Sequence, residues 1–144
     1  MENKINWNKI YRIIDANFNR TREGLRVVEE IARFFKEDSN ITATLRGIRH
    51  LLTKTFDNLN ISKKNLLSAR NSLNDVGYNQ KTFYENKRED IKDIAFANLR
   101  RIQESLRVLE EFSKLISSKQ SFAFKKMRFK VYTLEKEFFY ELFS

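Results

Sequence analysis

The sequence predicts an all-α protein, a four-helix bundle made of two duplicated helical hairpins with internal pseudo-twofold symmetry. An internal repeat, a scarcity of helix-breaking residues and apolar residues at helical spacing support this prediction. The 144 residues suffice for one hydrophobic core and include no proline and only three glycines. We therefore expect a single helical domain over residues 1–144, with hairpins over 5–59 and 86–143 and a connector over 60–85.

The repeat is the most informative feature of the chain. Residues 16–30 read ANFNRTREGLRVVEE, residues 97–111 read ANLRRIQESLRVLEE, and nine of the fifteen aligned positions are identical. A duplicated scaffold needs to share only its apolar core. These copies also share polar residues, namely Asn17 and Asn98, Arg20 and Arg101, Glu23 and Glu104, and Arg26 and Arg107. The shared polar residues suggest a functional site.

Two helices are expected in the first hairpin. Apolar residues recur at helical spacing over 5–36, and the polar cluster 37–40 then breaks the pattern. This cluster offers capping residues for a second helix over 41–59.

The second hairpin is expected to begin where Asn86 and Glu89 have capping-box spacing, with its first helix ending near residue 116. A break at Ser117 and Ser118 separates it from a last helix over 122–143. We expect the phenylalanines of this last helix to form its core face, namely Phe122, Phe124, Phe129, Phe138, Phe139 and Phe143.

Residues 62–84 form the least regular part of the chain. Turn-forming residues are concentrated at Asn74, Asp75 and Gly77. Connectors of this length inside compact domains are often functional.

Charge and composition narrow the classes of partner and site. The net charge of +9 and pI near 9.8 favour anionic partners such as phosphate compounds, nucleic acid, or acidic protein and membrane surfaces, although a lysine-rich surface also serves solubility. The absence of cysteine excludes disulfides and thiolate metal sites. The polar N-terminus and the lack of a long apolar stretch predict a cytoplasmic protein.

The helical wheel places some repeated polar residues inside. Asn17 and Asn98 fall in the middle of the apolar arcs of the two long helices, and Arg20 and Arg101 flank them, whereas Glu29 falls on the side or back. One interpretation is a structural network in which the asparagines bond each other and the arginines pair with the repeated glutamates. The other is a polar pocket whose guanidinium groups face an anion.

Other motifs point away from common nucleotide-binding folds. The chain has no GxxxxGK[ST] and no GxGxxG sequence, so a bound phosphate would need arginine side chains and helix ends. His50 is the only histidine, and a lone histidine is more often a surface residue than a catalyst. With one histidine and no cysteine, magnesium held by carboxylates is a better expectation than zinc.

Four segments together resemble the helical domain that is fused to thiamine-phosphate synthase in some bacteria. They are RIIDANFNRTREGLRVVEEIARF at 12–34, LRGIRH at 45–50, RNSLNDVG at 70–77, and the second repeat at 97–111. The resemblance covers nearly the whole chain and departs from the usual pattern at Asn71, where that family tends to have aspartate. The chain has no room for the (β/α)₈ barrel after which such proteins are often named.

The resemblance implies a kinase in thiamine biosynthesis. Its acceptor would be 4-amino-5-hydroxymethyl-2-methylpyrimidine phosphate, its donor ATP, and its product the diphosphate that thiamine-phosphate synthase consumes. The acceptor is a phosphate monoester that is already largely anionic at neutral pH, so alignment and charge neutralisation are the main requirements.

Chemistry and motif position then give the expected roles. The catalytic candidates are Arg20, Arg101, Arg49 and Arg70. The substrate-binding candidates are Asn17, Gly24, His50, Asn98, Glu23 and Glu104. Asp75 or Asp15 would hold magnesium.

Differences between the two copies predict where the ligand lies. Gly24 stands opposite Ser105 in the alignment, and His50 stands opposite Phe129 when the second helices are aligned through their arginines. These differences make the first half more polar and roomier. We therefore expect an anion near Asn17, Arg20, Gly24 and His50, with Arg101 reaching across.

Two alternatives belong to other functional classes. One is a non-catalytic helical module that binds a phosphorylated thiamine precursor or a partner enzyme. The other is a basic nucleic-acid-binding protein, which would place its arginines on an exposed stripe rather than inward. The expected partners are the phosphorylated pyrimidine and a nucleotide, with thiamine-phosphate synthase and a second copy of the chain as further candidates; nucleic acid and membrane are not expected.

Overall fold

The computed structural model describes residues 4–80 and 87–143, and this part of the chain contains helices and no strand. It has five α-helices: α1 (Trp7–Glu30), α2 (Ser39–Asp57), α3 (Lys63–Ala69), α4 (Ile91–Ser113) and α5 (Ser118–Glu137). Short π-helical turns follow α1 and α5, at η1 (Ile31–Phe35) and η4 (Phe138–Leu142). The all-α class is confirmed. Among the described helices, none has the length and apolar character needed to cross a membrane.

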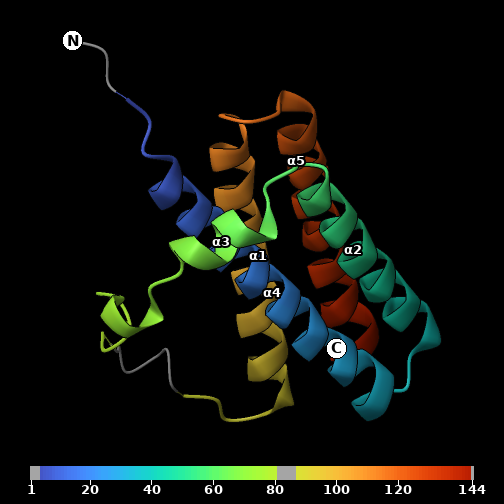
Figure 1. Ribbon diagram of the computed structural model, residues 1–144. Coiled ribbons are helices and arrows are strands. Elements are labelled where there is room, and N and C mark those ends of the chain that lie inside the picture. Colours follow the sequence, from blue (N-terminus) through green and yellow to red (C-terminus); the bar gives the residue numbers. More distant parts are fainter. Residues whose placement is uncertain (1–3, 81–86, 144) are drawn as a thin grey trace.

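The two long helices that carry the repeat cross each other at the centre of the molecule (Figure 1). At the crossing, the hydroxyl group of Thr21 on α1 and that of Ser105 on α4 form a hydrogen bond, with 2.6 Å between the two oxygen atoms. α2 packs on α1 and α5, and α5 packs on α4, so that these four helices enclose one apolar core. The pseudo-twofold symmetry of the two hairpins stays a prediction, which superposing 5–59 on 86–143 would test.

Helix ends follow the capping residues in two of the three expected places. The Asp38 carboxylate accepts a hydrogen bond from the backbone N–H of Ile41 at 2.8 Å and begins α2. Ser117 Oγ accepts from the backbone N–H of Gln120 at 3.3 Å and begins α5. The breaks at 37–40 and at Ser117 are therefore confirmed.

α4 begins later than the sequence pattern indicated. Asn86 lies outside the described residues, and the cap is Asp90, whose carboxylate accepts from the N–H of Asp93 at 2.8 Å. The Asp93 carboxylate in turn accepts from the N–H of Glu89 at 3.1 Å. The first bond satisfies a free N–H of the first helical turn, and the second fixes the residue just before the cap, so the helix starts here.

The connector contains a helix that the sequence analysis did not expect. α3 is capped by Ser62, whose Oγ accepts from the N–H of Asn65 at 3.1 Å. Leu66 and Ala69 are buried, and α3 packs on α1. A helix of seven residues is too short to give a clear helical period in the sequence. It is stabilised mainly by packing on α1, which the sequence pattern does not show.

The phenylalanines of the last helix do not share one face. Phe124 and Phe138 are completely buried, whereas Phe122, Phe129 and Phe139 are exposed. Core positions on α5 recur every three or four residues from Phe124 to Phe138, and Phe122 and Phe129 fall outside that series. The prediction of a single phenylalanine core face is therefore wrong.

A buried glutamate fastens each helical hairpin. Glu29 is completely buried, and its carboxylate accepts from Arg49 Nε at 3.2 Å and pairs with Arg26 Nη1 at 3.4 Å. We call Glu29 with these two arginines the first clamp; it ties α1 to α2. The expected placement of Glu29 on the side or back of its helix is wrong. The helical wheel was centred on the apolar residues of α1 alone, and these do not show that α2 packs over Glu29.

The second hairpin has the same arrangement. Glu110 is 4% exposed and accepts from Arg128 Nη2 at 2.9 Å and from Arg107 Nη1 at 3.0 Å. We call these three residues the second clamp. The hydrogen bond to Glu110 raises the pKa of Arg128 above its usual value. The repeated pairs Arg26–Glu29 and Arg107–Glu110 therefore serve the fold in both halves.

Candidate functional site

A groove of about 360 Å³ lies where α1 meets the connector, and we call it the connector groove. It is lined by Arg12, Asp15, Ala16, Asn19, Glu23, Arg70, Asn71, Ser72 and Asp75. The residues from α1 recur at intervals of three and four, so they form one face of that helix. The groove thus joins the first repeat to the RNSLND segment, two parts of the chain that the family resemblance rests on.

The docking of α3 delivers Arg70 to this groove. Ala69, the last residue of α3, is buried, and Arg70 follows in an extended conformation. Its Nε and Nη2 donate to the two oxygens of Asp15, at 2.6 and 2.9 Å. This bidentate pair raises the pKa of Arg70, first through the hydrogen bond and then through the charge of Asp15. The guanidinium is therefore held in one orientation with its charge retained.

The segment after Arg70 is folded onto α1 by polar contacts. Arg12 Nη2 donates to the backbone carbonyl of Asn71 at 3.0 Å. The side chains of Asn71 and Asn74 bond each other at 2.9 Å, and the Asp75 carboxylate accepts from the N–H of Gly77 at 2.8 Å. These bonds close a tight turn of the kind that asparagine and aspartate favour.

The groove contains two guanidinium groups and three carboxylates. Asp15 is compensated by Arg70, whereas Glu23 accepts no hydrogen bond from any residue that the structure describes. Asp75 uses one oxygen for its turn and keeps the other available. The groove can therefore present both anion-binding arginines and a carboxylate to a polar ligand.

Four of the candidate site residues come together here: Arg70, Asp15, Glu23 and Asp75. Arg12 and Asn19 also line this groove, although neither was a candidate from the sequence. The missed signal was present, because Arg12 and Asn19 lie on the same helical face as Asp15 and Glu23.

Arg20 and Arg101 do not point inward. Both are exposed, neither lines the connector groove, and Arg20 Nη1 donates to Asn17 Oδ1 at 3.3 Å. The inward placement expected from the wheel is wrong, because a long arginine at the edge of an apolar arc reaches solvent. Inward arginines therefore cannot serve as the argument against nucleic-acid binding.

The repeated asparagines hold their own helices. Asn17 Nδ2 donates to the carbonyl of Ile13 and Asn98 Nδ2 to that of Ile94, both at 2.8 Å. They do not bond each other across the helix crossing, so the predicted bond between the two asparagines is wrong, although their role here is structural. Their identical local bonds explain why both copies can retain asparagine without a ligand.

Gly24 lies at a close approach of the two long helices. A Cβ atom at this position would lie 2.8 Å from Ile102 Cγ1 and 3.4 Å from the carbonyl oxygen of Asn98. The space beside Gly24 is thus filled by α4, and the expected ligand pocket at this glycine is wrong. His50 is exposed on α2 and does not line the connector groove.

Arg49 also lies apart from this groove. Its guanidinium is bound in the first clamp, and Glu29 is fourteen residues along α1 from Asp15, a separation of about 21 Å. The catalytic candidates Arg49 and Arg70 therefore belong to different parts of the molecule.

The remaining candidate, Glu104, lines a second groove of about 360 Å³ between α4 and α5. We call it the α4–α5 groove; its lining is Arg100, Gln103, Glu104, Arg107, Arg128 and Tyr132. Arg107 and Arg128 are bound to Glu110 in the second clamp. Because their charge is largely compensated, this groove is a weaker anion site than its arginine content indicates.

Neither groove forms a complete metal site from protein ligands alone. Within residues 4–80 and 87–143, no group of three or more histidine, cysteine, aspartate or glutamate residues could hold a metal ion. Asp15 is bound to Arg70 through both oxygens, which removes it as a magnesium ligand in this arrangement.

Comparison with known proteins identifies related sequences. Residues 12–137 match the ThiD2 family. A thiamine-phosphate synthase from Nostoc punctiforme is 40% identical over 126 residues, which is 88% of this chain and 34% of that protein. One from Synechocystis is 40% identical over 88% of the chain and 35% of its own length, and one from Rhodopirellula baltica is 35% identical over 89% and 34%.

The chain spans about a third of the length of the curated relatives that it matches. No solved structure matches the chain. The matched region contains both clamps and every residue that lines the connector groove.

Proposed function

The chain belongs to the ThiD2 family, and we propose that it phosphorylates 4-amino-5-hydroxymethyl-2-methylpyrimidine phosphate to the diphosphate, with ATP as donor. The names of its relatives support a role in thiamine biosynthesis. The resemblance of the motifs supports this acceptor, because its diphosphate is what a thiamine-phosphate synthase consumes.

The observation that carries the proposal is the position of Arg70. Helix α3 brings this residue against α1, so Arg70 and Arg12 line the same groove. Two arginines in one groove suit a ligand that carries several phosphate oxygens, since guanidinium groups bind such oxygens bidentately.

The proposed reaction needs little proton transfer. The second pKa of the acceptor phosphate is about 6, so an anionic oxygen is available at neutral pH. That oxygen forms a bond to the γ-phosphorus of ATP, the bond from this phosphorus to the β–γ bridging oxygen breaks, and ADP leaves. Arg12 and Arg70 would bring the two polyanions together and offset their repulsion.

Asp15 has a positioning role in this scheme. Its two oxygens fix Nε and Nη2 of Arg70, and Nη1 bonds no residue that the structure describes. Nη1 can therefore bind a phosphate oxygen without breaking the pair. This role replaces the expected one as a magnesium ligand.

Magnesium fits the groove through Asp75. Magnesium in phosphoryl-transfer sites is held by one or two carboxylates together with phosphate oxygens, so the lack of a larger acidic cluster does not oppose it. When bound, it would neutralise charge on the transferring phosphate. Glu23 remains to accept a hydrogen bond from the amino group of the pyrimidine ring. Asn19 can offer its Oδ1 as a second acceptor, because its Nδ2 already donates to the backbone carbonyl and the carboxylate of Asp15, at 3.0 and 3.3 Å.

The test is incubation of the chain with the pyrimidine monophosphate, ATP and Mg²⁺, with chromatographic detection of the diphosphate and ADP. We expect equal amounts of the two products. Asp75→Asn should raise the Mg²⁺ concentration needed for half-maximal rate, whereas Asp57→Asn, an exposed aspartate at the end of α2, should leave it unchanged.

Binding of the monophosphate without product formation would contradict the kinase proposal. It would instead favour the non-catalytic module considered from the sequence. Nucleic-acid binding has less support, because the arginines of both clamps are engaged by carboxylates and are not free to contact phosphates.

A further inference from the structure

The outer face of α5 carries exposed aromatic residues that the core does not use. Phe122 is 57% exposed and Phe129 is 53% exposed, although the opposite face of the same helix is already buried. A helix that is apolar on both faces ordinarily has a neighbour on each. Exposed aromatic side chains of this size call for an explanation.

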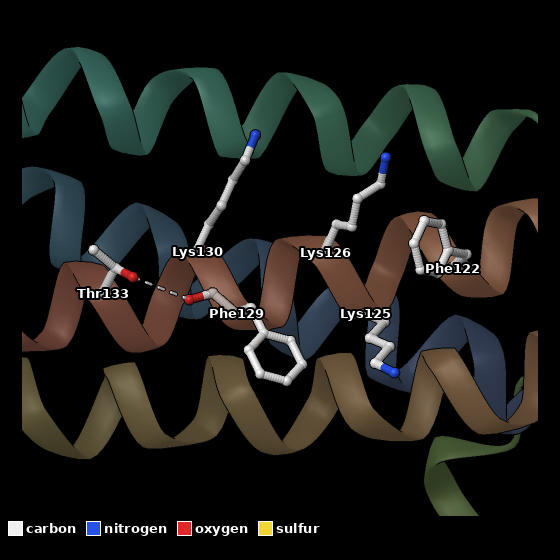
Figure 2. Close-up of a pocket in the computed structure, with 6 residues that line it drawn as sticks. All are labelled: Phe122, Lys125, Lys126, Phe129, Lys130 and Thr133. Carbon is white, nitrogen blue, oxygen red and sulfur yellow. Dashed lines mark hydrogen bonds between the residues drawn. The ribbon is translucent and has the colours of Figure 1, made fainter.

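These two rings border a shallow hollow of about 440 Å³ on α5. Its lining, which we call the α5 stripe, is Phe122, Lys125, Lys126, Phe129, Lys130 and Thr133. Figure 2 shows Lys126 and Lys130 extending toward α2, while Phe129 and Lys125 extend toward α4. The lining includes three ammonium groups and no carboxylate.

The other half of the molecule shows that the fold does not need this stripe. When α2 and α5 are aligned through Arg49 and Arg128, Phe122 corresponds to Ala43, Lys126 to Gly47 and Phe129 to His50. At the other stripe positions Lys125 corresponds to Arg46, Lys130 to Leu51 and Thr133 to Lys54. The equivalent face of α2 thus carries no phenylalanine, yet its clamp is formed in the same way. The two phenylalanines are specific to α5.

We propose that the α5 stripe is a docking surface for an acidic amphipathic helix of a partner protein. Phe122 and Phe129 are seven residues apart, about 10.5 Å along the helix. A partner helix repeats its own apolar positions at the same interval, so two of its side chains can rest against the two rings. Acidic residues beside that apolar seam would pair with the lysines.

The charges of the stripe argue against self-association. Two copies meeting through this face would bring six lysines together without a carboxylate from the stripe to compensate them. The net charge of +9 also disfavours a second copy as the occupant. An acidic partner gains from both features, because long-range attraction speeds its association.

The test uses synthetic three-heptad peptides with the intact chain. One peptide has leucine at the seam and glutamate beside it; its control has the same composition in a permuted order. We expect the acidic peptide to bind, as measured by fluorescence anisotropy, and the permuted one to bind at least about tenfold more weakly.

Variants of the chain then locate the binding site. Lys126→Glu with Lys130→Glu, and Phe129→Ala separately, should each weaken binding of the acidic peptide about tenfold. The matched control is Lys63→Glu with Lys64→Glu, two exposed lysines on α3, which should not change it. Circular dichroism confirms that each variant is folded. The lysine-reversed variant should in turn bind a peptide whose glutamates are replaced by lysines.

Three results overturn the proposal. The acidic peptide fails to bind, or it binds the lysine-reversed and control variants equally. Alternatively, anionic phosphatidylglycerol vesicles or a single-stranded RNA bind through the α5 stripe when the acidic peptide does not, which would assign this face to a different class of partner.

Discussion

The two halves of the molecule share a scaffold but differ at the surface. Each half buries one glutamate between two arginines, at 3.4 and 3.2 Å in the first clamp and at 3.0 and 2.9 Å in the second. Within the part of the chain that the structure describes, only the α1–α2 half is covered by a connector, which adds Arg70 and Asp75 to a groove on α1. The repeated residues that form the two clamps therefore hold the fold together. Most of the proposed chemistry belongs to residues that one half has and the other lacks, and Glu23, which is equivalent to Glu104, is the exception.

The two grooves show the same contrast. Glu23 and Glu104 are equivalent in the repeat and each lines a groove. Beside Glu23 the connector supplies an arginine with one guanidinium nitrogen available. Beside Glu104 the arginines of the second clamp are already paired. A shared residue thus acquires a different environment in each half.

The largest expected effect separates the two grooves. Arg70→Ala should lower the rate of diphosphate formation about 100-fold, because it removes a charged donor aimed at the transferring phosphate. Arg100→Ala in the α4–α5 groove should leave the rate within about twofold, because that arginine is exposed and only loosely paired with Glu135, at 3.9 Å. Steady-state kinetics on both variants makes the measurement. Equal losses would mean that both halves take part in the chemistry.

The next effect tests whether the clamps are equivalent. Arg49→Ala and Arg128→Ala should each destabilise the fold by about 3 kcal/mol, because each leaves a buried glutamate short of its main partner. Urea denaturation followed by circular dichroism measures both. Activity per folded molecule should be retained in Arg49→Ala, since this residue lies far from the connector groove. A loss confined to one variant would show that only one clamp supports the fold.

A smaller effect tests the helix crossing. Gly24→Ala should destabilise the protein by about 1–2 kcal/mol, because the new Cβ would clash with the buried Ile102. Gly47→Ala is the matched control: it meets no atom within 4 Å, so it should stabilise α2 by about 0.5–1 kcal/mol. If Gly24→Ala were also stabilising, the close approach of α1 and α4 would be contradicted.

The smallest effect concerns pH and the surface next to the second clamp. The hydrogen bond from Lys114 lowers the pKa of Glu111 below its ordinary value of 4.5. The contribution of Glu111 to stability is therefore present above that value and disappears as the pH falls through the lowered pKa. Glu111→Gln should slightly reduce the slope of the free energy of unfolding against pH below about pH 4.5, as measured by urea denaturation at several pH values. A Glu111→Gln curve that keeps the full slope would exclude this pair as its source.

Much of the fold could be predicted from the sequence. The repeat, the helical spacing and the caps at Asp38 and Ser117 predicted the all-α class and the ends of several helices, because these features depend on neighbours within a few residues. α3 was missed, since its seven residues carry too little periodicity, and the start of α4 was placed too early.

The site was predicted only in part for a related reason. The sequence by itself determined which residues share a face of α1, and Asp15 and Glu23 were among the candidates. It did not determine which other helices pack against each face of α1. For this reason Glu29 was expected at the surface and Arg20 in the interior, and the structure shows the reverse.

Only the tertiary structure decided which polar residues meet. Arg70 reaches Asp15 across 55 positions of the chain because Leu66 and Ala69 bury themselves against α1 and carry the next residue with them. Likewise, Gly24 faces Ile102 because α1 and α4 cross there. Local propensity acts over a few residues, whereas these contacts follow from the burial of apolar surface between distant helices.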